Sequence, residues 1–134
     1  MKKKIFTIED KMFKTEPLFL VNCSRREAAK YLKRRFNVDL DVDNSDDDHS
    51  RGSASATTLH YPKAPWRVIW IRDFNRHKSE DIAELVHELM HLVIRICEDK
   101  GIPITGNHPT TGAVLDEPPA YMMDFFVKSF LDKI

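Results

Sequence analysis

The segment 78–100 constrains the fold more than any other part of the chain, because it is long, regular and amphipathic. Ser79 stands where an N-cap belongs, Glu80 and Asp81 follow in the first turn, and Gly101 stands where a helix would end. At about 100° per residue, the charged and histidine side chains fall within one arc of about 120°, and apolar side chains occupy the rest. The pattern predicts a long helix packed on several sides, at the centre of a domain core.

The length and charge of the chain limit the classes of protein to which it can belong. It has 134 residues, 42% of them hydrophobic, and 21 basic side chains balance 21 acidic ones. A single domain over 1–134 is expected at this size. The zero net charge argues against a nucleic-acid-binding protein. Because the sequence has neither a signal-peptide pattern nor a run of about 18 apolar residues, we expect a cytoplasmic protein outside the membrane.

The remaining sequence predicts a small sheet and two further helices. Apolar runs bounded by turn residues indicate four strands, at 5–8, 17–22, 56–61 and 67–74. The five-residue connection 62–66, which contains both turn prolines, predicts an antiparallel pair of the last two strands. Ser24 and Glu27 have capping-box spacing and open a helix over 24–36, whose many basic residues form a solvated face. We expect the acidic and serine-rich segment 39–55 to be a mobile loop.

The long predicted helix carries a motif with a known chemical use. His87 and His91 are four residues apart, so both imidazoles lie on one face, one turn from each other. Two imidazoles in this arrangement can bind one Zn²⁺, while Glu88 between them points toward a metal-bound water. Zinc lowers the pKa of such a water to about 7, and a neighbouring carboxylate can accept its proton. A solvent-facing polar stripe with pairs four residues apart is the alternative interpretation.

A zinc site of this kind needs a third protein ligand. In one arrangement a third histidine stands six residues after the second, but Cys97 occupies that position, on the apolar side of the helix, and is interpreted as a core thiol. Asp116 and Glu117 open a second amphipathic helix that runs to about residue 131. A carboxylate there can be a simple helix cap. The helix with the histidine motif ends about sixteen residues earlier, and a connection of that length allows the chain to fold back, so a ligand role is favoured.

The histidine motif and the acidic residues that follow it together resemble the pattern of a known enzyme family. The histidine motif, followed 26 positions after His91 by Glu117 and then by Ala120, resembles the gluzincin branch of zinc metallopeptidases. The shortness of the chain is further similar to minimal gluzincins and to small phage-encoded or prophage-encoded metallopeptidase-like proteins. The resemblance covers about 69–131, and the part of the chain before it resembles no family.

The resemblance implies both a fold and a site. The fold would be α+β and zincin-like, with a small antiparallel or mixed sheet packed on the active-site helix and a C-terminal helix that carries the glutamate. His87, His91 and Glu117 would bind one zinc ion per chain, and Glu88 would be the general base. An edge strand over 67–74 would hold a peptide or protein substrate in extended form by main-chain hydrogen bonds.

Some positions depart from the family pattern. Many gluzincins have an aspartate four residues after the ligand glutamate, where this chain has Tyr121; Asp124 lies one turn further. Tyr121 is a candidate catalytic residue whose hydroxyl could accept an imidazole N–H or stabilise an oxyanion, while Asp124 could supply the missing carboxylate. His108, in the connecting loop, is a second candidate that could reach the site as an electrophile. Two prolines follow Glu117 and fit only the first turn of a helix, which leaves Asp116 as the alternative ligand.

The sequence thus predicts a zinc-dependent metallopeptidase that hydrolyses peptide bonds through a metal-activated water. The alternative is a catalytically silent zincin-like module that binds zinc and acts by interaction.

Overall fold

The computed structural model describes residues 2–40, 56–104 and 117–134, which form an α+β fold with one four-stranded mixed sheet and three helices. In chain order the elements are β1 (Lys4–Thr7), β2 (Leu18–Val21), α1 (Arg25–Phe36), β3 (Ala56–His60), β4 (Arg67–Ile71), α2 (Ser79–Lys100) and α3 (Glu117–Lys133). The predicted strands and helices are confirmed, with bounds that shift by at most three residues. Most of the predicted acidic loop, 41–55, lies outside the described residues.

The sheet has the strand order β1-β2-β4-β3. β1 pairs with β2, and β3 with β4, in antiparallel register, whereas β2 and β4 are parallel. The antiparallel pairing predicted across the turn 62–66 is therefore confirmed. The prediction that 67–74 contains an edge strand is wrong, because β4 lies between β2 and β3. Its continuous apolar run, Val68 to Ile71, is buried throughout, as is typical of a central strand.

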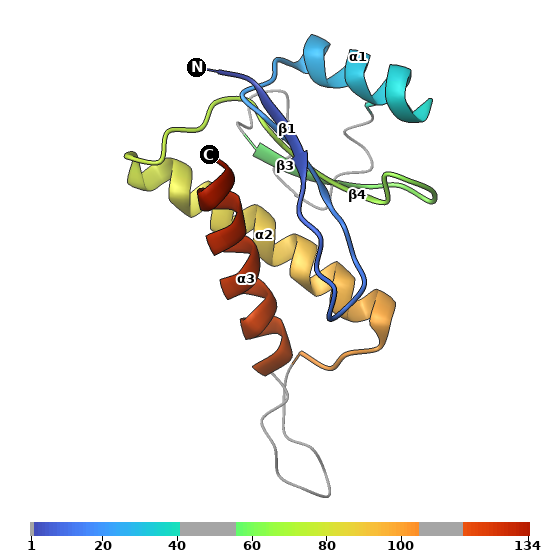
Figure 1. Ribbon diagram of the computed structural model, residues 1–134, viewed down its shortest axis with the longest axis vertical. Helices are drawn as coiled ribbons and strands as arrows, with labels where there is room; N and C mark the ends of the chain where they lie inside the picture. Colours follow the sequence, from blue (N-terminus) through green and yellow to red (C-terminus); the bar gives the residue numbers. More distant parts are fainter. Residues whose placement is uncertain (1, 41–55, 105–116) are drawn as a thin grey trace, which may run out of the picture.

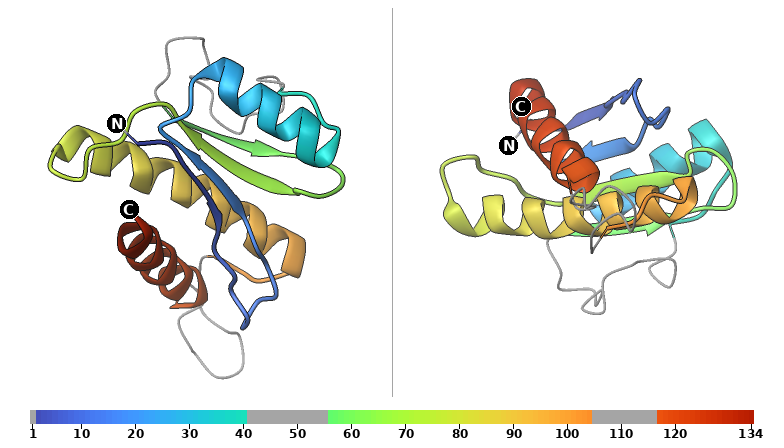
Figure 2. Two further views of the ribbon diagram at one scale, coloured as in Figure 1. Left: turned by 45° about the horizontal axis from the view of Figure 1, so that its top comes forward. Right: turned by 90° about the horizontal axis from the view of Figure 1, so that it is seen from below.

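The fold has three layers, with the sheet between α1 on one face and α2 and α3 on the other (Figure 1). Side chains along β2 and β4 alternate between these two faces. Leu18, Leu20, Val68 and Trp70 pack toward α1 on one face of the sheet. Phe19, Val21, Ile69 and Ile71 pack toward α2 and α3 on the other face. Figure 2 shows the same arrangement from two further directions, with α1 separated from α2 and α3 by the strands. Both faces of the sheet are thus covered by helices.

The helix ends are set by local hydrogen bonds. Ser24 and Glu27 form the predicted capping box of α1. α2 ends at Gly101, whose φ of 67° is the left-handed conformation that glycine adopts without strain. The N-cap predicted at Ser79 is wrong by one residue, since Lys78 is the N-cap and its side chain caps nothing. Instead, Asp81 in the first turn accepts a hydrogen bond from the backbone N–H of Asn75, which fastens the preceding loop to the helix.

The buried face of α2 differs from the face predicted by its apolar pattern. Leu85, Leu89, Leu92, Val93, Ile96 and Cys97 are buried as expected. Val86 and Met90 belong to the apolar sector but are exposed, Met90 by 46%. Glu88 belongs to the polar stripe but is buried, with 2% of its surface exposed. The packed face of α2 is therefore rotated toward Glu88 relative to the prediction.

α3 is anchored beneath the other half of the sheet. The ring of Phe130 contacts Phe6 on β1, Phe19 on β2 and Phe74, with centroids 5.1 to 5.8 Å apart. Lys4 on β1 donates hydrogen bonds to the last two carbonyl oxygens of the chain. The C-terminal end of α3 is thus held against β1 and β2, whereas Glu88 of α2 lies against β3, at the opposite edge of the sheet.

Candidate metal centre

His87 and His91 converge on one point beside α2. Their Nε2 atoms are 3.2 Å apart, and the two rings meet edge to face with centroids 4.8 Å apart. Ligand nitrogens that lie 2.0–2.1 Å from a tetrahedral zinc ion are about 3.3 to 3.4 Å from each other. The spacing of the two nitrogens therefore fits two adjacent corners of a tetrahedral site. The side chain of His87 is half exposed, so a metal ion would meet the pair from the solvent side.

Glu88 lies beside this pair and is held by a neighbouring strand. Its Oε1 atom is 4.0 Å from Nε2 of His87. Its Oε2 atom lies 2.5 Å from the hydroxyl of Thr58 on β3, and that hydroxyl is also 3.0 Å from the backbone carbonyl oxygen of Glu88. Thr58 and Glu88 are both buried. Thr58 thus keeps Oε2 on the sheet side of the carboxylate, while Oε1 is the oxygen nearer the histidines.

The third ligand expected from the sequence is not placed with the histidine pair. Within 2–40, 56–104 and 117–134, no three His, Cys, Asp or Glu side chains are grouped so that they could hold a metal ion. Glu117 is exposed in the first turn of α3. The C-terminal end of α3 is held under β1 and β2, whereas Glu88 lies against β3 at the other edge of the sheet. Asp116, the alternative ligand, and His108 lie outside the described residues.

No contact in the described residues joins Tyr121 to the pair. Its side chain is 68% exposed on α3, and it forms no hydrogen bond with any residue that the structure describes. Asp124 is exposed on the same helix. The structure therefore brings together three of the sequence-predicted residues, His87, Glu88 and His91, and does not group Glu117 with the two histidines.

Thr58 is the residue at this site that the sequence did not identify. Threonine is common in strands, and the two neighbouring threonines of β3 give no sign of which one faces α2. The alternation of side chains along β3 could have identified Thr58, but only once the orientation of a neighbouring residue of the strand is known. Leu59 packs toward α1, so Thr58 must point to the opposite face, toward α2.

Comparisons of the chain with protein-family models, with curated proteins and with solved structures find no match. The function is therefore inferred from the geometry of the histidine pair and its neighbours. Among the helices that the structure describes, none combines the length and the apolar composition needed to cross a membrane.

Proposed function

We propose that the protein is a zinc-dependent metallopeptidase of the gluzincin type, which hydrolyses peptide bonds. The observation that carries this proposal is the 3.2 Å separation of the Nε2 atoms of His87 and His91, with Glu88 between them in sequence and beside them in space. One zinc ion held by this pair would lower the pKa of a bound water and polarise the carbonyl of a substrate. A cytoplasmic location and a phage origin remain predictions from the sequence.

Glu88 is the proposed general base. Its carboxylate has two distinguishable oxygens: Thr58 holds Oε2, and Oε1 faces the side on which His87 lies. Oε1 is therefore the oxygen that would accept the proton of the attacking water. The hydrogen bond from Thr58 fixes the carboxylate against rotation, which favours catalysis because less ordering is needed when substrate binds.

The proposed position of the substrate moves from 67–74 to β3. Within the described residues β3 pairs with β4 on one side only, so its outer edge presents main-chain N–H and C=O groups. An extended peptide can pair with such an edge. Thr58 lies in the middle of β3 and touches Glu88, so a peptide paired with this strand would run close to the proposed base.

Glu117 remains the proposed third ligand, with Asp116 as its alternative. To bind zinc together with the histidine pair, Glu117 would have to move from the position that it has in the structure. Replacing each acid separately by alanine and measuring zinc affinity distinguishes the two. The variant that lacks the ligand should bind zinc more than about 100-fold more weakly, since losses of groups that only orient ligands already cost about 10- to 100-fold.

The test of the proposal is metal content together with peptide cleavage. We expect about one zinc per chain by plasma mass spectrometry, lost in His87→Ala and in His91→Ala. His77→Ala is the matched control, since His77 is exposed in the loop before α2 and should keep the metal. Purified wild-type protein that is folded and binds no added zinc would refute the assignment.

Catalysis is tested by Glu88→Gln. This variant should keep zinc and lose about 10²- to 10⁴-fold in the rate of cleavage of an unstructured protein such as casein. Glu80→Gln, an exposed acid in the first turn of the same helix, is the control. Cleavage that survives in Glu88→Gln would contradict the role of this residue.

The burial of Glu88 favours a second candidate, a zinc-binding module without catalysis. A carboxylate that is 2% exposed and bonded to Thr58 can serve to join β3 to α2 rather than to accept protons. In that case wild type would bind zinc through His87 and His91 but cleave no peptide, and Glu88→Gln would lower only the stability of the fold.

A further inference from the structure

A cleft of about 750 Å³ lies at one end of the sheet, away from the histidine pair. Its walls come from the connection between β1 and β2, the turn between β3 and β4, and the last residues of α2. In Figures 1 and 2 these three segments lie on the same side of the molecule. The volume lies within the range of about 300 to 1,000 Å³ that is typical of ligand sites in proteins.

Aromatic rings and prolines form much of the apolar part of this cleft, namely Phe36, Tyr61, Trp66, Pro17 and Pro65. Trp66 is 59% exposed although it is the largest of these side chains. Exposed tryptophan next to proline and tyrosine is a common surface for packing the rings of a bound peptide.

The backbone of the cleft is strained at two positions. Trp66 and Lys14 both have a φ of 54°, in the left-handed region. The other two non-glycine residues with positive φ in the described part of the chain, Asn22 and Asn37, are of a type that tolerates this conformation. Strain of this kind is concentrated where side chains are held for binding. In the cleft, one of these two positions carries the exposed indole of Trp66.

The charges around the cleft favour an anionic ligand. Lys11, Lys14 and Lys100 line it and form no ion pair with any described residue. Of the three acids that also line it, Asp99 pairs with Arg67 at 2.6 Å, whereas Glu9 and Glu16 form no ion pair with any described residue. Three lysines therefore face two acids outside ion pairs, which leaves the balance of charge in the cleft positive.

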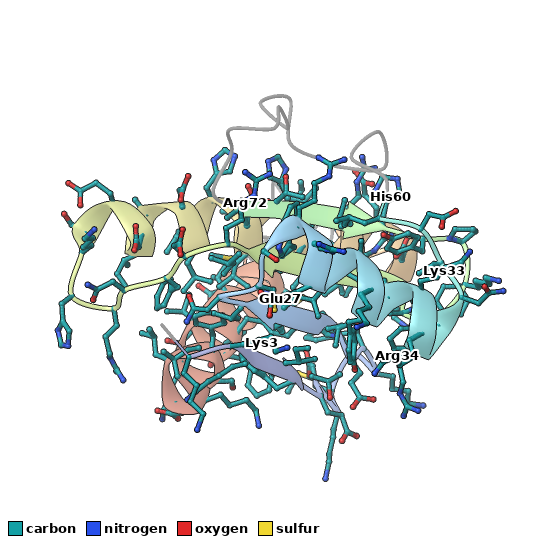
Figure 3. The ribbon with its side chains drawn as sticks, turned by 90° about the horizontal axis from the view of Figure 1, so that it is seen from above. Lys3, Glu27, Lys33, Arg34, His60 and Arg72 are labelled. Carbon is teal, nitrogen blue, oxygen red and sulfur yellow. The ribbon has the colours of Figure 1, made fainter. Side chains whose placement is uncertain are left out.

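α1 extends this positive region beyond the cleft. Phe36, which forms part of the wall, is the last residue of α1, and the final turn of that helix carries Lys33, Arg34 and Arg35. Figure 3 shows Lys33 and Arg34 at this end of the helix. Lys33 forms an ion pair with Asp39, whereas Arg34 and Arg35 pair with no described residue.

We propose that this cleft binds an acidic polypeptide segment that places a proline or aromatic side chain against Trp66. Glu9 and Glu16 also line the cleft, so a ligand must place its negative charges near the lysines and away from these two acids. A peptide can space its acidic side chains in this way, whereas a nucleic acid carries a phosphate at every nucleotide. The cleft is separate from the proposed metal centre. Ile96, at its floor, is nine residues after His87 and therefore lies on the opposite side of α2. Binding here requires neither zinc nor catalysis.

The first experiment selects peptides without assuming a sequence. A displayed library of random twelve-residue peptides is panned in parallel on wild type and on Trp66→Ala. Peptides enriched on wild type should have a net negative charge and contain proline or an aromatic residue. Their enrichment should fall by about tenfold or more on Trp66→Ala, as is usual when a central tryptophan of an interface is removed. No enrichment, or equal enrichment on both proteins, would overturn the proposal.

The second experiment measures the affinity of the most enriched peptide, made without tryptophan, by the fluorescence of Trp66. Trp70 is buried and donates a hydrogen bond to the carbonyl of Cys23, so its emission in Trp66→Ala reports whether that variant is folded. Lys11→Glu, which leaves the aromatic wall intact, should weaken binding about tenfold, and added salt should weaken wild-type binding. Met12→Ala is the matched control, because Met12 is 77% exposed beside Lys11 and does not line the cleft.

Two further arms separate this proposal from others. The double variant His87→Ala/His91→Ala should bind the peptide as wild type does. Failure of the peptidase proposal would therefore not affect the proposal that this cleft binds a peptide. A twelve-nucleotide oligo(dT) should bind at least about tenfold more weakly than the peptide. Tighter binding of oligo(dT) at Trp66 would replace the peptide by a nucleic acid and overturn the proposal.

Discussion

Thr58 in the middle of β3 and Glu88 in the middle of α2 share a hydrogen bond of 2.5 Å, and both side chains are buried. This contact joins the edge strand of the sheet to the helix that carries the histidine pair. Because the carboxylate is buried, it depends on the hydroxyl of Thr58 for part of its solvation. The position of Glu88 relative to His87 is therefore set by a residue thirty positions earlier in the chain.

Thr58→Val should lower the free energy of unfolding by about 1 to 3 kcal/mol, because valine keeps the shape of threonine and removes a hydrogen bond from a buried carboxylate. Thr58→Ser keeps the hydroxyl and should lose less. Combining Thr58→Val with Glu88→Leu should recover most of the loss, since both partners are then apolar. Urea unfolding followed by circular dichroism measures all four proteins. An equal loss in the valine and serine variants would show that the hydroxyl contributes nothing.

Much of the fold could be predicted from local patterns. The length of α2, its stop at Gly101 and the capping box at Ser24 each depend on residues close together in sequence, and the structure bears them out. The central position of β4 could not be predicted in this way, because its second partner, β2, is separated from it by α1 and β3. The same holds for the burial of Glu88, which depends on Thr58.

The candidate site likewise has one part that follows from local sequence and one part that depends on contacts between distant segments. His87 and His91 are one helical turn apart, so their convergence follows from the sequence once the helix is known. Placing Glu117 with them requires knowledge of how α3 packs. No helical pattern indicates that Phe130 would fasten α3 beneath β1 and β2.

Phe130→Ala should destabilise the protein by about 3 to 5 kcal/mol, a large share of the stability of a domain of this size. The ring of Phe130 is fully buried and lies 5.6 Å from that of Phe19 and 5.1 Å from that of Phe74, so its removal leaves a cavity between α3 and the sheet. Phe125→Ala on the same helix is the matched control and should cost about 1 kcal/mol or less, since Phe125 is 38% exposed. Similar unfolding midpoints for the two variants would contradict this anchoring of α3.

The capping box of α1 should make stability depend on pH. The backbone N–H of Ser24 donates to the carboxylate of Glu27, and this bond, with smaller effects from Lys3 and from the Ser24 side chain, lowers the pKa of Glu27 below 4.5. A carboxyl group whose pKa is lower in the folded state stabilises the fold above its ordinary pKa. That contribution is lost as the pH falls through the lower folded value.

Glu27→Gln isolates the charge, because glutamine keeps the acceptor oxygen. Its thermal unfolding midpoint should lie below that of wild type at pH 6, and the difference should shrink steadily between about pH 5 and pH 3. Ser24→Ala, which removes the cap itself, should cost about 1 kcal/mol at neutral pH. A gap between wild type and Glu27→Gln that stays constant down to pH 3 would show that the carboxylate charge is not involved.

The two cysteines should be unreactive in the folded protein. Burial raises the pKa of the Cys23 thiol to about 11 and also raises the pKa of Cys97. Only about one Cys23 in a thousand would then be a thiolate at pH 8, and the thiolate is the form that reacts. Cys23 packs on the α1 face of the sheet and Cys97 on the α2 face, so the strands also keep them from forming a disulfide.

Iodoacetamide at pH 8 should modify neither cysteine in native protein and both in guanidinium chloride, as measured by mass spectrometry. Cys97→Ala should still bind zinc, since Cys97 points into the core. Rapid labelling of either thiol in the native protein, or loss of zinc binding in Cys97→Ala, would contradict the burial of these cysteines in the core.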